Sequence, residues 1–275
     1  MTKLSVDTIE FYITHVCNLT CNHCRTFNNY DLKGHFKFNL DQIQPWAEKV
    51  DFRHLEIIGG EPTISPYLKD WMHGLSQLWP DSKRYIDTNG TYLSKTKNLK
   101  SLLLDYNFSL KVSIHSYDVL DRVITEVFDT FGDCEVQTNL SKIDSQILLL
   151  TPEGTTIRIQ YYNHFQETPF QNNKFYNSDP DIAHRNCKIR GCNHFFDGKI
   201  YKCGMLVSGS TMLETLDLEA NSLLDSYKPL TVDQLPNTPK EYNKLMKETS
   251  IPQCALCSEP NNTVRLDALL KSNRT

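Results

Sequence analysis

The stretch Cys17-Asn18-Leu19-Thr20-Cys21-Asn22-His23-Cys24 places three cysteines in a short loop at C-x3-C-x2-C spacing. The loop follows a strand-like apolar run over residues 9–14. Ligation by four cysteines is the usual way to hold a [4Fe–4S] cluster, so three thiolates would leave one iron open to a small molecule. Zinc would need a fourth ligand, such as His15 or His23. The cysteine triplet alone therefore leaves a zinc site and an iron–sulfur site both open.

The composition is that of an ordinary globular protein. Of its 275 residues, 39% are hydrophobic and 23% charged, and the net charge is −4. There is no overall basic field, so nucleic acid is not a favoured partner. No run approaches the roughly 18 apolar residues that a membrane span needs, and the N-terminus lacks the apolar core of a signal peptide. We therefore expect a cytoplasmic chain without a membrane partner. Eight of its nine cysteines are clustered, and we expect these to bind metal or do chemistry rather than form disulfides. Cys134 stands alone and is expected to be a small buried hydrophobic residue.

Strand-like and helical patterns alternate along residues 8–163. The expected strands cover 9–14, 54–58, 85–88, 108–114, 134–139 and 156–162. The expected helices cover about 41–50, 66–79, 99–106, 116–131 and 142–149. Parallel strands need crossover connections of this length, so the sequence predicts an α/β fold containing a partial (β/α)6 barrel. The expected domains are the barrel (1–163), a linker (164–186), a small cysteine-rich domain (187–260) and a polar tail (261–275).

Glycines and polar residues follow the expected strands. Gly59-Gly60-Glu61-Pro62 comes directly after the second strand. Polar candidates at the other strand ends are Thr88, Asn89, Ser113, His115 and Asn139. In folds built on parallel strands, ligands bind beyond the carboxyl ends of the strands. Two successive glycines also let the backbone approach a ligand closely. The sequence therefore predicts one site that contains the cysteine loop and the Gly-Gly turn.

These two motifs together resemble the radical S-adenosylmethionine (SAM) superfamily over about residues 8–163. The resemblance implies an enzyme that reductively cleaves SAM at a [4Fe–4S] cluster to a 5′-deoxyadenosyl radical, which abstracts hydrogen from a substrate. The implied cluster ligands are Cys17, Cys21 and Cys24. The implied contacts with SAM come from Gly59, Gly60, Glu61, Thr88, Asn89, Ser113, His115 and Asn139, with His23 near the adenine. For each polar residue, a role as a helix cap or turn former is the alternative.

A second group of cysteines lies in the last third of the chain, around an expected hairpin with Asp197-Gly198 as its turn. Its members are Cys187, Cys203, Cys254 and Cys257. The pattern resembles the SPASM and shorter twitch domains of radical SAM enzymes, which implies that these four cysteines bind a second, auxiliary [4Fe–4S] cluster. Cys192 departs from the pattern and is an alternative to Cys187. A structural zinc site is the alternative for the whole group.

Arg158, Gln160 and Tyr162 alternate along the last expected strand and could bind a polar or anionic substrate from inside the barrel. The resemblance implies oxidation or modification of a small molecule or a peptide, with a one-electron donor such as flavodoxin or ferredoxin. A peptide or protein maturase that forms a cross-link is one alternative. A non-catalytic iron–sulfur or zinc-binding protein on the same scaffold is an alternative of another class.

Overall fold

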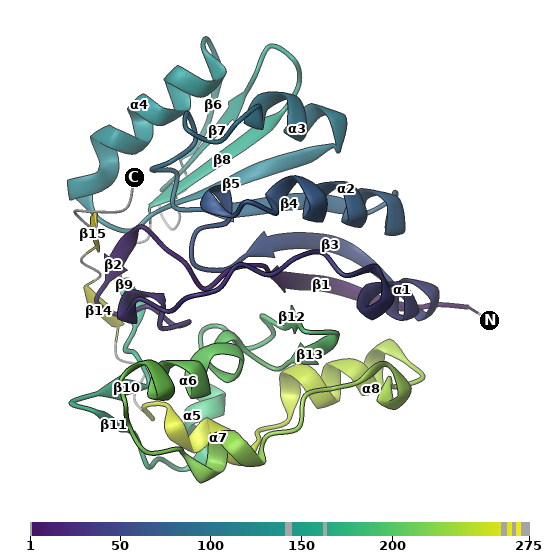
Figure 1. Ribbon diagram of the computed structural model, residues 1–275, viewed down its shortest axis with the longest axis vertical. Helices are drawn as coiled ribbons and strands as arrows, with labels where there is room; N and C mark the ends of the chain where they lie inside the picture. The colour runs from purple at the N-terminus through teal and green to yellow at the C-terminus, as the bar shows by residue number, and fades with distance from the viewer. Residues whose placement is uncertain (1, 141–144, 162–163, 260–262, 266–267, 271–275) are drawn as a thin grey trace.

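The computed structural model describes residues 2–140, 145–161, 164–259, 263–265 and 268–270. Five neighbouring parallel strands form the centre of its main sheet: β1 (Leu4–Tyr12), β3 (Val50–Ile58), β4 (Lys83–Thr88), β5 (Phe108–Ile114) and β8 (Thr156–Tyr161). The crossover helices are α1 (Leu40–Lys49), α2 (Leu68–Leu78), α3 (Leu99–Asp105) and α4 (Leu120–Phe131). The predicted mixed α/β fold with a largely parallel sheet is confirmed (Figure 1).

Alternation along the central strands separates an apolar face from a polar one. Ile9 and Phe11 of β1 are fully buried, and both belong to the large hydrophobic cluster that includes the four crossover helices. On α1, Ile43, Trp46 and Ala47 recur at helical spacing and enter the same cluster. Burying each large apolar side chain contributes roughly 1.5–3 kcal/mol, so this face of the sheet anchors the helices. The opposite face is left free to carry polar side chains.

The far edge of the sheet departs from the expected strand–helix repeat. β6 (Glu135–Leu140) and β7 (Ser145–Leu150) pair antiparallel, and β7 pairs antiparallel with β8. The prediction of a helix over 142–149 is therefore wrong for its described part, and the predicted fifth strand does not neighbour the fourth. The apolar run at residues 147–150 fits a strand as well as a helical segment, and here the open edge of β8 decides the outcome.

The C-terminal third supplies the other edge of the sheet. β12 (His194–Phe196) pairs parallel with β1, and β13 (Lys199–Tyr201) pairs antiparallel with β12. In the described part of the chain the strand order is thus β13-β12-β1-β3-β4-β5-β8-β7-β6. The expected hairpin is confirmed, and both turn residues have positive φ, 47° at Asp197 and 71° at Gly198. The hairpin extends the main sheet instead of standing apart from it.

Further helices and short strand pairs lie outside the main sheet. The helices are α5 (Pro180–Asn186), α6 (Gly204–Thr215), α7 (Ser222–Ser226) and α8 (Pro239–Asn243), followed by a π-helical turn (Lys244–Glu248) and a 3₁₀ helix (Pro252–Leu256). The short strand pairs are β2 (Leu19–Cys21) with β15 (Ala268–Leu270), β9 (His164–Gln166) with β14 (Thr263–Arg265), and β10 (Phe170–Gln171) with β11 (Lys174–Phe175). Figure 1 shows β2, β9, β14 and β15 beyond the carboxyl ends of the parallel strands. Among the described residues, no helix has the length and apolar character needed to cross a membrane.

Candidate cofactor site

The Gly59-Gly60 turn lies against the backbone that leads into the cysteine loop. The amide of Gly60 donates to Thr14 O at 2.8 Å, and the amide of Glu61 donates to Val16 O at 2.9 Å. A Cβ on Gly60 would lie 2.3 Å from Val16 O, and one on Gly59 would lie 2.5 Å from Thr14 O. Both positions need glycine because the protein's own backbone fills the space that a side chain would take.

Gly60→Ala is expected to destabilise the protein by roughly 3 kcal/mol, because the obstructing atoms are backbone and cannot rotate away. Urea unfolding measures the change. Gly209→Ala is the matched control: its Cβ would meet the end of the Leu224 side chain at 3.0 Å, which can shift, and it lies within α6. Equal destabilisation by the two substitutions would contradict the close approach at Gly60.

The carboxylate of Glu61 ties this turn to the end of β4. Its Oε1 accepts from Thr63 N at 3.0 Å, Thr63 Oγ1 at 2.6 Å and Thr88 Oγ1 at 2.7 Å, and its Oε2 accepts from Asn89 N at 2.7 Å. Burial raises the pKa of Glu61, and these hydrogen bonds oppose that rise. The side chain of Glu61 therefore serves the scaffold, and only its backbone adjoins the cysteine loop.

Glu61→Ala is expected to lower the free energy of unfolding by at least about 3 kcal/mol, because buried donors lose a charged acceptor. Glu153→Ala removes an equally large carboxylate from an exposed ion pair with Lys100, and little change in stability is expected there. Chemical unfolding of the two variants tests the difference. Similar midpoints for both would show that the Glu61 network does not stabilise the strand ends.

A cavity of about 220 Å³ lies between the cysteine loop and the carboxyl ends of β3, β4 and β5; we call it the cysteine-loop cavity. It brings together most of the site residues expected from the sequence: Cys17, Cys21, Cys24, Gly59, Gly60, Thr88, Asn89, Ser113, His115 and His23. Asn139 lies on β6, with β8 and β7 between it and β5. Its side chain is outside the described part of the structure, so its expected contact with SAM stays a prediction.

Hydrogen-bond donors surround the first cysteine. Cys17 is 8% exposed, and its Sγ lies 3.5 Å from Leu19 N and 3.9 Å from Asn89 Nδ2. Asn89 Nδ2 also donates to Asn18 Oδ1 at 2.9 Å, which fixes the amide beside the sulfur. Hydrogen bonds to cysteine sulfur and burial are the features that set the potential of an iron–sulfur cluster, so this set of thiols suits one.

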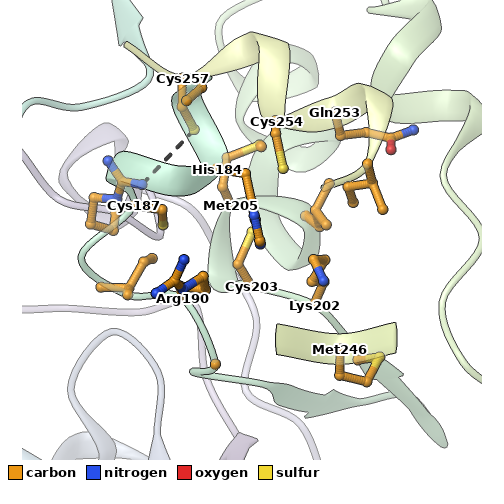
Figure 2. A pocket seen from close by; sticks show the side chains of 16 residues that line it. His184, Cys187, Arg190, Lys202, Cys203, Met205, Met246, Gln253, Cys254 and Cys257 are labelled. Atoms are coloured by element: carbon orange, nitrogen blue, oxygen red, sulfur yellow. Dashed lines mark hydrogen bonds between the residues drawn. The ribbon is translucent and has the colours of Figure 1, made fainter. Parts of the chain in front are cut away.

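Four of the C-terminal cysteines line a second cavity of about 40 Å³, the auxiliary cysteine cavity: Cys187, Cys203, Cys254 and Cys257 (Figure 2). Cys192 does not line it, and its thiol is hydrogen-bonded to Glu10. Burial and two neighbouring thiols raise the pKa of Cys203 to about 12. Among the described residues, no three His, Cys, Asp or Glu side chains are grouped so that they could hold one metal ion.

Arg25 connects the two cavities. It follows Cys24 directly in sequence and lines both of them. Its Nη1 donates to Glu167 O at 2.9 Å and its Nη2 donates to Cys257 Sγ at 3.9 Å, the bond drawn in Figure 2. Burial raises the pKa of Cys257, and the Arg25 guanidinium opposes that rise because it favours the thiolate.

A third cavity of about 160 Å³, the polar pocket, opens on the polar face of the sheet. Its lining consists of Glu56, Asp87, Lys111, Val112, Ser113, Arg158 and Gln160. Two of its residues, Asp87 and Ser113, also line the cysteine-loop cavity, so the two spaces adjoin. Of the three expected substrate residues, Arg158 and Gln160 line this pocket, and Tyr162 lies outside the described residues.

Comparisons with solved structures find similarity at low sequence identity. No family model matches the chain, and no curated protein matches it significantly. A crystal structure of BtrN with AdoMet and 2-DOIA is 21% identical over 42% of this chain and 48% of that chain, with a TM-score of 0.33. An open conformation of selenomethionine BtrN is 14% identical over 95% of this chain and 94% of that chain, with a TM-score of 0.45. Streptococcus suis SuiB bound to S-adenosylmethionine is 16% identical over 45% of this chain and 38% of that chain, with a TM-score of 0.27. The first match thus spans about half of that BtrN chain.

Sequence reasoning missed the charged residues of the polar face: Glu10, Glu56, Asp87 and Lys111. A signal was present for three of them, because Glu10, Glu56 and Lys111 each lie between apolar neighbours in a strand, where alternation places them on the face opposite those neighbours. Asp87 has an apolar neighbour on one side only, Ile86. The registers Glu10↔Glu56 and Asp87↔Lys111 then align these residues across the sheet. Arg25 had no such signal, since its partner Cys257 lies more than two hundred residues away in the chain.

Proposed function

We propose that this protein is a radical SAM enzyme that holds a [4Fe–4S] cluster with Cys17, Cys21 and Cys24 and binds SAM beside it. The observation that carries the proposal is that the C-x3-C-x2-C loop and the Gly59-Gly60 turn line one cavity at the ends of parallel strands. The strand-end residues Thr88, Asn89, Ser113 and His115 line the same cavity and supply polar groups for SAM. The proposed cluster would present its open iron to this cavity, and the polar strand-end residues line the same cavity. This arrangement would suit a ligand that chelates the iron.

When bound, the reduced cluster would supply the electron that cleaves SAM into methionine and a 5′-deoxyadenosyl radical. The protein's own residues would bind and orient SAM and would shield the cluster from water. Burial of Cys17 keeps water from the cluster ligand, and Asn89 directs an N–H group toward its sulfur. The tight contact of Gly60 with Val16 holds the cysteine loop against the strand ends. The thiols therefore keep a fixed position relative to the polar residues at the strand ends.

The proposal extends to a second [4Fe–4S] cluster in the auxiliary cysteine cavity. Four thiols from three separate segments line that cavity, which is the usual ligand number for such a cluster. Three cationic residues lie in the same lining: Arg25, which donates to Cys257, the buried Lys202, and Arg190. Positive charge at these positions offsets the charge of four thiolates and their cluster.

The substrate is proposed to enter the polar pocket, next to the cysteine-loop cavity. A space of about 160 Å³ lined by Arg158 and Gln160 favours a small polar molecule over a peptide. Electrons would come from a one-electron donor such as flavodoxin or ferredoxin. The proposed reaction is an oxidation or modification of that molecule, begun by the loss of one hydrogen atom to the adenosyl radical. In an oxidation, the auxiliary cluster would accept the second electron.

Anaerobic reconstitution with iron and sulfide tests the proposal. We expect brown protein with 4Fe–4S absorbance, and 5′-deoxyadenosine release, measured by mass spectrometry, when dithionite and SAM are added. Tightly bound zinc together with no 5′-deoxyadenosine would instead support a non-catalytic zinc protein. The same assay run with candidate small molecules identifies the substrate by an increase in 5′-deoxyadenosine.

A further inference from the structure

The auxiliary cysteine cavity is lined by positive charge as well as by thiols. Arg25, Arg190 and Lys202 lie in its wall, and none of the described residues that line it is an aspartate or a glutamate (Figure 2). Reduction adds one negative charge to an iron–sulfur cluster, and nearby positive charge stabilises that form. A cluster in this cavity would therefore be easier to reduce than one in neutral surroundings.

The three cations differ in their exposure and in their contacts. Arg190 is exposed, so solvent and salt screen its charge. Lys202 is 7% exposed, and its Nζ donates to Leu245 O at 2.9 Å. Arg25 is half-buried, and its Nη2 donates directly to Cys257 Sγ at 3.9 Å. Arg25 therefore combines a partly shielded charge with a hydrogen bond to a thiol, and both features act on the potential of a cluster.

A second hydrogen bond fixes the guanidinium of Arg25. Its Nη1 donates to Glu167 O at 2.9 Å, and the amide of the next residue, Thr168, donates to His23 Nδ1 at 3.4 Å. The same short segment thus holds the cysteine loop at two points. No carboxylate in the described part of the chain forms an ion pair with Arg25. The positive charge beside Cys257 is therefore held in place and is not neutralised by an acidic side chain there.

We propose that Arg25 raises the reduction potential of the auxiliary cluster through its contact with Cys257, and so favours transfer of the second electron to that cluster. This inference rests on the proposed function. In an oxidation, the substrate loses one hydrogen atom to the adenosyl radical, and the resulting substrate radical loses one electron to the oxidised auxiliary cluster and one proton to water. The oxidised form of the one-electron carrier then takes this electron from the cluster. Arg25 acts through a cluster ligand and has no assigned contact with the substrate.

A redox titration followed by electron paramagnetic resonance tests the inference on the reconstituted protein. The auxiliary signal is the one that is missing when Cys254 and Cys257 are replaced by alanine. Arg25→Gln keeps an N–H donor on a side chain of similar shape and removes the charge. We expect a roughly tenfold smaller equilibrium constant for reduction of the auxiliary cluster, which is a midpoint potential about 59 mV more negative for a one-electron couple.

Two matched variants separate the fixed charge of Arg25 from charge in general. Arg190→Gln removes an exposed cation from the same lining, and its equilibrium constant should stay within about threefold of the wild type because solvent screens that charge. Arg25→Lys keeps the charge and should also stay within about threefold. Iron should remain at about eight per chain in all three variants.

An unchanged auxiliary potential in Arg25→Gln, with iron retained, would reject the inference. Shifts of equal size in Arg25→Gln and Arg25→Lys would show that the charge is not the cause. Equal shifts in Arg25→Gln and Arg190→Gln would assign the effect to the overall charge of the cavity. Equal shifts of both cluster signals in Arg25→Gln would show a general change in the protein instead of the contact with Cys257.

Arg25→Gln could also lose the auxiliary iron. Arg25→Met, which is uncharged and of similar length, is then titrated in its place. Loss of the auxiliary iron in both variants would mean that Arg25 is needed to assemble the cluster, and the proposed effect on its potential would be rejected. Failure of the proposed function shows separately, as absent iron or absent 5′-deoxyadenosine in the wild type.

Discussion

Replacing Cys17, Cys21 and Cys24 together by alanine is expected to reduce 5′-deoxyadenosine release at least a hundredfold. Bound iron should fall at the same time from about eight to about four per chain, the content of one remaining cubane cluster. The physical reason is that the three thiols line the cavity that would hold the open-iron cluster, and alanine offers no ligand in their place. Iron is measured colorimetrically after anaerobic reconstitution, and the nucleoside is measured by mass spectrometry.

Cys134→Ala is the matched control for this triple substitution. Cys134 is a free cysteine of intermediate burial between α4 and β6, and it packs against the main hydrophobic cluster. Its removal should leave iron and 5′-deoxyadenosine unchanged. An unchanged iron content in the triple variant, or zinc in place of iron in the wild type, would contradict a cluster at the cysteine loop.

Replacing Cys254 and Cys257 by alanine is expected to remove the other half of the iron, again from about eight to about four per chain. Two of the four thiols around the auxiliary cysteine cavity would be lost, and a cluster with two protein ligands is not held. The electron paramagnetic resonance signal of the SAM-binding cluster should persist, because its three cysteines lie in the other cavity. This variant therefore separates the two clusters.

Cys192→Ala is the control that decides the ligand set of the second cluster. The thiol of Cys192 is hydrogen-bonded to Glu10 and does not line the auxiliary cysteine cavity, so about eight irons should remain. Cys187→Ala should lose about four. The reverse result, with iron lost in Cys192→Ala and kept in Cys187→Ala, would assign the ligand to Cys192.

Individual helices and turns could be predicted from patterns of neighbouring residues in the sequence. Helical spacing of Ile43, Trp46 and Ala47 marked α1, and the Asp197-Gly198 dipeptide marked a hairpin, because both signals depend on neighbours in the chain. The predicted helix over 142–149 is instead a strand from residue 145 to 150, because a short run of this length and apolar content fits a helix as well as a strand. Its pairing with β8 is a tertiary fact, and so is the resulting position of β6 at the edge of the sheet.

By itself, the sequence determined the two motifs of the candidate site and the strand–helix alternation that brings them together. Cysteine spacing and paired glycines are local, and parallel strands with crossover helices align their carboxyl ends whatever the strand order. Only the tertiary structure decided which distant residues meet: four of the five C-terminal cysteines around one cavity, Arg25 beside Cys257, and Asp87 against Glu56. Asp87 and Glu56 are 31 positions apart in the chain, and Arg25 and Cys257 are 232 positions apart. Such contacts depend on strand register and packing, which no short motif encodes.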